Sequence, residues 1–64
     1  MLVKICFANR EKVVFLEAKD LTIDKVERSV HIYTGSQIYD YWLNEIGYLL
    51  VDGSVAVQEG RSTY

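Results

Sequence analysis

His31 is the only histidine of the chain, and the expected strand pairing places it between the carboxylates of Asp24 and Asp40. An imidazole beside carboxylates can act as a general base or a pH switch, because neighbouring negative charges raise its pKa. The same side chains could ligate a metal ion. We favour a structural interpretation, an exposed charged row across three strands, because such cross-strand pairs are common in sheets. Catalysis would need a nucleophile or oxyanion site as well, and a metal centre would need more ligands. The sequence therefore predicts no catalytic, cofactor or metal site.

The segment VHIYTGSQIYDYWL, residues 30–43, holds four aromatic residues, including the only tryptophan. Gly35-Ser36 predicts a two-residue type II′ turn, in which the glycine supplies the positive φ of the first central position. The resulting register places Tyr39 opposite Ile32 and Tyr41 opposite Val30 on one face of the hairpin. Large aromatic and aliphatic side chains that share a face indicate core packing.

The other face of this hairpin carries His31 opposite Asp40 and Tyr33 opposite Ile38, with Trp42 further along. An open face of this composition resembles the hot spots of protein–protein interfaces. Aromatic side chains on a small β domain can also stack single-stranded bases, but they do so beside a basic groove, and the two aspartates would repel phosphate. We therefore predict a partner-binding surface. The candidate contact residues are Tyr33, Ile38, Trp42, His31 and, from the first hairpin, Phe15.

The first hairpin is predicted from two apolar runs, Leu2–Ala8 and Val13–Ala18, joined by the loop NREK. Pairing Ala8 with Val13 places six apolar residues on one face, because side chains alternate along a strand. It also sets Lys4 opposite Glu17, a favourable cross-strand pair. The six apolar residues are Val3, Ile5, Phe7, Val14, Leu16 and Ala18.

The second face of the first hairpin carries Cys6, Ala8, Val13 and Phe15, so it is also apolar. Strands that are buried on both faces read as nearly continuous apolar runs. The sequence thus predicts that the rest of the chain, or another molecule, covers this face. Cys6 is interpreted as a small buried hydrophobic residue, because a reactive thiol needs an exposed, electropositive setting.

The remaining runs predict five further strands separated by turns. Asp52-Gly53 is the strongest type I′ hairpin signal. In Asp40–Leu50 a strand-turn-strand competes with one or two helical turns, since apolar residues also recur there at helical spacing. Residues 59–64 are expected to form a loose tail. The predicted strands are Leu21–Val26, Val30–Thr34, Gln37–Leu43, Tyr48–Val51 and Ser54–Gln58, with turns at Glu27-Arg28 and Asn44–Gly47.

The predicted fold is a single all-β domain over residues 1–64, an antiparallel meander of six or seven short strands in a barrel-like or strongly bent sheet. SH3-like and OB-like architectures have a suitable size. A chain of 64 residues hides only about 60% of its unfolded surface, so its own core is marginal. Its single cysteine excludes an internal disulfide, and half of its residues are hydrophobic. These properties favour self-association or a protein partner.

The formal net charge is −2, and the seven basic residues form no run along the sequence. Proteins that grip phosphate backbones usually carry a basic patch, so the composition argues against nucleic acid as a partner. No apolar run approaches the roughly 18 residues that span a membrane. A lone thiol is typical of a reducing compartment, and we expect a cytoplasmic protein.

We therefore predict a non-enzymatic protein-interaction module that acts as a homodimer or another homo-oligomer, or as an accessory or regulatory subunit of a larger assembly. The alternative is a small single-stranded nucleic-acid-binding or regulatory β-barrel protein. An enzyme built on His31 is the third and least favoured hypothesis. No cofactor is expected.

Overall fold

The computed structural model describes residues 1–9 and 12–63, which form eight strands and one short 3-10 helix. The all-β prediction is confirmed. Between residues 40 and 50 the chain forms the predicted strand-turn-strand, and its turn is a single 3-10 turn. Part of the predicted first loop, Arg10 and Glu11, lies outside the described residues. The elements are β1 (Leu2–Phe7), β2 (Val13–Glu17), β3 (Asp20–Asp24), β4 (Ser29–Tyr33), β5 (Ile38–Trp42), η1 (Leu43–Glu45), β6 (Ile46–Val51), β7 (Ser54–Gln58) and β8 (Arg61–Ser62).

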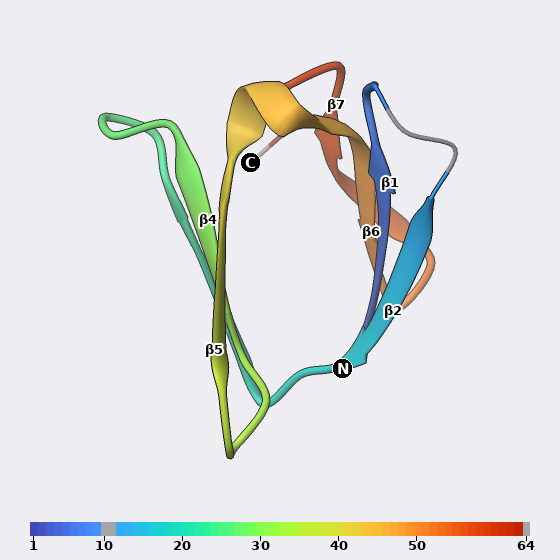
Figure 1. The fold of residues 1–64 in the computed structure, drawn as a ribbon, viewed down its shortest axis with the longest axis vertical. Helices are drawn as coiled ribbons and strands as arrows, with labels where there is room; N and C mark the ends of the chain where they lie inside the picture. Colours follow the sequence, from blue (N-terminus) through green and yellow to red (C-terminus); the bar gives the residue numbers. More distant parts are fainter. Residues whose placement is uncertain (10–11, 64) are drawn as a thin grey trace.

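The strands form two antiparallel sheets that face each other (Figure 1). The larger sheet has the order β2-β1-β6-β7-β8, and the smaller sheet has the order β3-β4-β5. The sheets are not closed into a barrel, so the barrel-like form of the prediction is only partly supported. No helix in the described part of the chain has the length and apolar character needed to span a bilayer.

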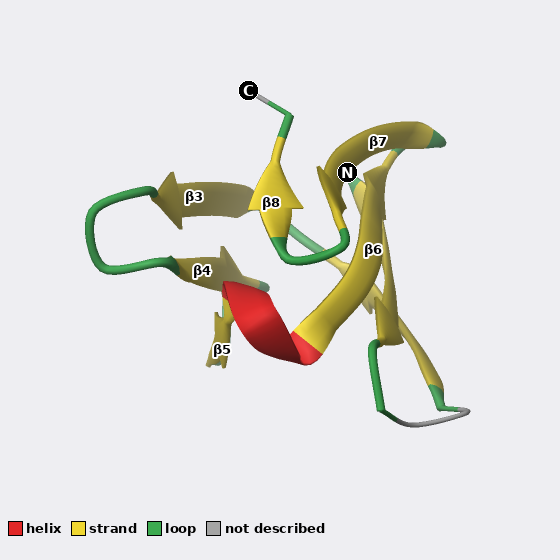
Figure 2. Ribbon diagram, turned by 90° about the horizontal axis from the view of Figure 1, so that it is seen from above, coloured by secondary structure: helices red, strands yellow, loops and turns green. Residues whose placement is uncertain are grey.

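Two corners connect the sheets. At the first, β2 passes into β3 through Ala18 and Lys19, whose backbone amides point to different sheets. The amide of Ala18 donates to Met1 O at 2.7 Å, and that of Lys19 donates to Tyr33 O at 2.7 Å. At the second corner, η1 links β5 to β6 (Figure 2). Its first amide, that of Leu43, donates to Arg28 O at 2.8 Å, which ties the β3–β4 turn to η1.

The core lies between the sheets and is built from the inward side chains of both. The inner-face residues expected for the first hairpin are buried or pack against this core, as the alternation along the strands predicted. Tyr39 and Tyr41 also pack against it, and the rings of Phe7 and Tyr41 meet edge to face at 5.2 Å. Burial raises the pKa of the Tyr41 hydroxyl. The buried residues are Val3, Ile5, Ala18, Val30, Ile32, Leu43, Ile46, Leu49, Ala56 and Val57.

The β4–β5 hairpin has the predicted register. His31 lies opposite Asp40, and Tyr33 lies opposite Ile38. Gly35 has a φ of 99°, as a turn with glycine at its first central position requires. Each pair follows from this turn, so the outward-facing residues of the hairpin were predicted correctly from the sequence.

The predicted register of the first hairpin is wrong by two residues. Cys6, not Ala8, lies opposite Val13, and Lys4 therefore lies opposite Phe15 instead of Glu17. The reason is that the end of β1 pairs with the other neighbouring strand. The β1–β6 ladder has an irregularity after Cys6, and the amide of Ala8 then donates to Glu45 O at 2.8 Å. A shift of two residues leaves each side chain on its predicted face.

The β3–β4 register is also wrong by two residues, and for a different reason. Asp24 lies opposite Ser29, and Thr22 takes its expected place opposite His31. The carboxylate of Asp24 accepts hydrogen bonds from the amides of Val26 and Glu27, at 3.0 and 2.9 Å. This Asx-type capping builds a four-residue turn over residues 25–28 where a two-residue turn was expected.

The C-terminal residues form hairpins. Asp52 and Gly53 have φ values of 49° and 85°, which confirms the type I′ signal. Glu59 and Gly60, with φ values of 50° and 73°, make a second turn of the same kind. Strand β8 then pairs with β7. The expectation of a loose tail is therefore wrong for residues 59–63, and Tyr64 lies outside the described residues.

Candidate functional site

The outward side of the larger sheet is apolar and open. Its central row runs Phe15–Lys4–Leu50–Val55 across four strands, as the pairings of β1, β2, β6 and β7 require. Phe15 is 60% exposed, although phenylalanine is among the residues most often buried. We call this surface the outer apolar face. Its members are Leu2, Lys4, Cys6, Val13, Phe15, Tyr48, Leu50 and Val55.

Lys4 lies at the centre of the outer apolar face. Its amine lies 5.9 Å from the ring centroids of both Phe15 and Tyr48, within the range of cation–π attraction. The two rings thus attract Lys4, which is the only charged side chain of the central row. A side-chain hydrogen bond with Cys6 raises the pKa of the Tyr48 hydroxyl. Glu17 lies at the rim of the face, with its carboxylate 3.8 Å from the amino terminus.

The outward side of the smaller sheet is polar around His31. The Nδ1 atom of His31 lies 2.5 Å from Asp40 Oδ1, and its Nε2 atom lies 3.1 Å from Ser29 Oγ. The Ser29 hydroxyl in turn donates to Glu27 Oε1 at 3.3 Å. Hydrogen bonding to Asp40, together with the charges of Asp40, Glu27 and Asp24, raises the pKa of His31 although partial burial opposes the shift. The charged imidazolium form of His31 fits these hydrogen bonds best, because its two ring N–H groups can donate to Asp40 and Ser29.

The order Asp40–His31–Ser29 has the connectivity of a Ser-His-Asp triad. A nucleophile must meet the substrate, however, and Ser29 is only 3% exposed. Its hydroxyl is already shared between His31 and Glu27. The hydrogen bonds of this row connect the side chains of β4, β5 and the turn that precedes β4.

The five candidate contact residues predicted from sequence do not form one surface. Tyr33, Ile38 and Trp42 share the outward side of the smaller sheet with His31, and they are 43%, 65% and 53% exposed. Phe15 lies on the other sheet, on the outer apolar face. The structure thus separates two exposed hydrophobic surfaces, of which the one around Phe15 has fewer charges.

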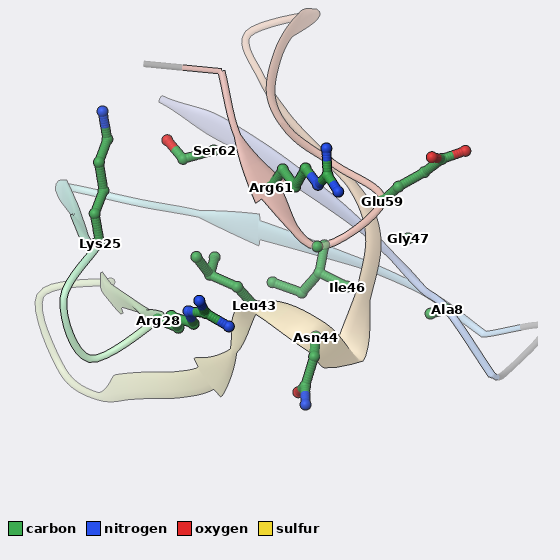
Figure 3. A pocket seen from close by; sticks show the side chains of 11 residues that line it. Ala8, Lys25, Arg28, Leu43, Asn44, Ile46, Gly47, Glu59, Arg61 and Ser62 are labelled. Carbon is green, nitrogen blue, oxygen red and sulfur yellow. The ribbon is translucent and has the colours of Figure 1, made fainter.

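A third feature, absent from the predictions, is a cleft of about 810 Å³ between the β3–β4 turn, η1 and the β7–β8 turn (Figure 3). Lys25, Arg28 and Arg61 line it, with Leu43 among its apolar residues. We call it the cationic cleft. Arg61 is distant in sequence from Lys25 and Arg28, and no local signal could have grouped it with them before the β8 hairpin was known.

Within residues 1–9 and 12–63, no group of three or more His, Cys, Asp and Glu side chains is arranged to hold a metal ion. No family model, no curated protein and no solved structure matches the chain. Its function is therefore argued from its own surfaces.

Proposed function

We propose that the chain is a non-enzymatic protein-interaction module that pairs with a second copy of itself through the outer apolar face. The observation that carries the proposal is the exposure of Phe15, at 60%, within a row across four strands in which every side chain except Lys4 is apolar. Exposed apolar patches of this kind mark contact surfaces in soluble proteins.

A second copy fits this face because its charges are self-complementary. Lys4 lies near the centre of the face, and Glu17 lies in the next row at the rim, where its carboxylate also lies 3.8 Å from the amino terminus. In a two-fold arrangement each patch meets the same patch of its partner. Lys4 of one copy can then face Glu17 of the other, while Phe15 is buried on both sides.

The size of the chain supports the same proposal. A domain of 64 residues has a small core, and association is one of the usual ways to stabilise such a domain. Burial of Ser29 supports a non-enzymatic role. The single thiol, Cys6, is compatible with our proposal of a cytoplasmic protein.

The test is sedimentation equilibrium over a range of concentrations and at two salt levels. We expect a dimer whose dissociation constant changes little with salt, because the contact is apolar. Phe15→Ser removes one anchor from each copy and should weaken the dimer by about 30-fold or more, as hot-spot residues do. Ile38→Ser is the matched control, because it removes a similarly exposed apolar residue from the other sheet.

Two results would contradict the proposal. One is a wild-type protein that stays monomeric at millimolar concentration. The other is a dimer that Ile38→Ser disrupts and Phe15→Ser leaves intact, which would place the contact on the outward side of the smaller sheet. Circular dichroism of both variants checks that each remains folded.

A further inference from the structure

The cationic cleft is positive in a protein of negative net charge. Among the described residues that line it, Lys25, Arg28 and Arg61 are basic and Glu59 is acidic. No described carboxylate lies within ion-pair distance of Arg28 or Arg61 in residues 1–9 and 12–63. Arg28 and Arg61 therefore bring positive charge to the cleft that no ion pair among the described residues neutralises, and such a concave site attracts anions.

The backbone around the cleft is specialised. Arg28 has a φ of 61°, a left-handed conformation that side chains other than glycine and asparagine rarely adopt. Gly60 lets the β7–β8 turn approach η1, because a Cβ at this position would lie 3.1 Å from Leu43 O. Strained backbone of this kind clusters at ligand sites. Here the backbone at Arg28 and at Gly60 brings an arginine and the β7–β8 turn to the cationic cleft.

An aromatic surface adjoins the cations. A smaller hollow of about 250 Å³ shares Arg28, Leu43, Asn44 and Gly60 with the cleft and adds Trp42 and Glu27. Trp42 is 53% exposed, so one part of its ring is open to a ligand. An exposed indole beside a guanidinium group is a combination that binds nucleotides, because bases stack on aromatic rings and phosphates pair with cations.

We propose that the cationic cleft and the adjoining hollow bind one nucleotide unit. Its phosphate lies on Arg28 and Arg61, and its base lies on Trp42. Glu27 gives the ligand a direction: its carboxylate repels phosphate, and it accepts a hydrogen bond from the amino group of a base. This site is separate from the outer apolar face, so the proposal does not depend on self-association.

The single tryptophan makes binding directly observable. The probes are AMP, inorganic phosphate and an eight-residue oligoadenylate, each titrated while the fluorescence of Trp42 is followed. AMP should quench the fluorescence, and its affinity should fall as salt is raised, because phosphate contacts are ionic. A much tighter oligoadenylate complex would identify the nucleotide of a single strand as the ligand, whereas equal or stronger binding of AMP would identify a free nucleotide.

Arg61→Gln should weaken AMP binding by about tenfold or more, since it removes a charged hydrogen-bond donor. Lys12→Gln is the matched control, which makes the same change of charge outside the cleft and should leave binding unchanged. Arg28→Gly provides a second cleft variant in case Arg61→Gln perturbs β8. The proposal is overturned if neither AMP nor oligoadenylate binds at millimolar concentration, if Lys12→Gln weakens binding as much as the cleft variants do, or if phosphate alone binds as tightly as AMP.

Discussion

Replacing Arg28 with glycine should make the protein more stable, although it removes a side chain from the cationic cleft. Arg28 holds a φ of 61° in the β3–β4 turn, and its carbonyl accepts a hydrogen bond from the amide of Leu43 at 2.8 Å. That bond and the Asp24 cap fix the turn, so the residue at position 28 must adopt the left-handed conformation whatever its side chain.

The expected gain follows from two opposing terms. A residue with a Cβ loses about 1–2 kcal/mol in the left-handed conformation, and glycine does not. Glycine in turn makes the unfolded chain more flexible, which costs about 0.4–1 kcal/mol. The net gain is about 0.5–1 kcal/mol, which corresponds to a rise in Tm of roughly 2–8 °C for a domain of this size.

The assay is urea unfolding followed by circular dichroism at one fixed protein concentration. Arg28→Ala is the matched control, because it removes the same guanidinium group and keeps the Cβ. We expect the glycine variant to be more stable than the alanine variant by about 1 kcal/mol. A glycine variant that is less stable than the alanine variant would refute the reasoning, since it would show that the left-handed backbone at position 28 is not a strain in the folded state.

Three further predictions concern the pH response, a close backbone approach and the core. The folded pKa of His31 lies above its ordinary value of 6.5, chiefly because of the hydrogen bond to Asp40. The stabilisation by the imidazolium is therefore complete below about pH 6.5 and is lost as the pH rises through the folded pKa. Titration by NMR should show the raised pKa, and Asp40→Asn should lower it; an unchanged value in that variant would exclude Asp40 as the cause. Gly60→Ala should be more destabilising than Gly53→Ala in thermal unfolding. Both glycines have a positive φ, but only a Cβ at position 60 would lie against a carbonyl oxygen, that of Leu43. Equal losses of stability would contradict the close approach of Gly60 to Leu43. Ile5→Ala should lower the free energy of unfolding in urea by about 2–5 kcal/mol, because Ile5 is fully buried. Ile38→Ala, at a position 65% exposed, should lower it much less. Similar losses in the two variants would contradict the assignment of Ile5 to the core.

The sequence was most informative where a turn and the apolar alternation agreed. Gly35-Ser36 fixed every pair of the β4–β5 hairpin, and Asp52-Gly53 fixed the turn before β7. The faces of the first hairpin were also correct, because alternation depends on the parity of the register and not on its exact value.

The errors came from interactions that a local pattern does not contain. Asp24 caps its own turn and so leaves the row opposite His31, and the end of β1 turns towards β6 instead of β2. The row of Asp40, His31 and Ser29 was anticipated only in its first pair. The cationic cleft was missed because Arg61 belongs to a short strand, β8, which the sequence pattern did not predict.

The central claim is that two copies meet through the outer apolar face, and the most direct test locates that contact. A mixture of isotope-labelled and unlabelled protein allows NMR to detect contacts between copies only. The account predicts contacts between copies from the ring of Phe15 and the methyl groups of Leu2, Val13 and Val55, with none from Ile38. Contacts from Ile38 and Trp42 in place of Phe15, or no contacts between copies at millimolar concentration, would contradict it.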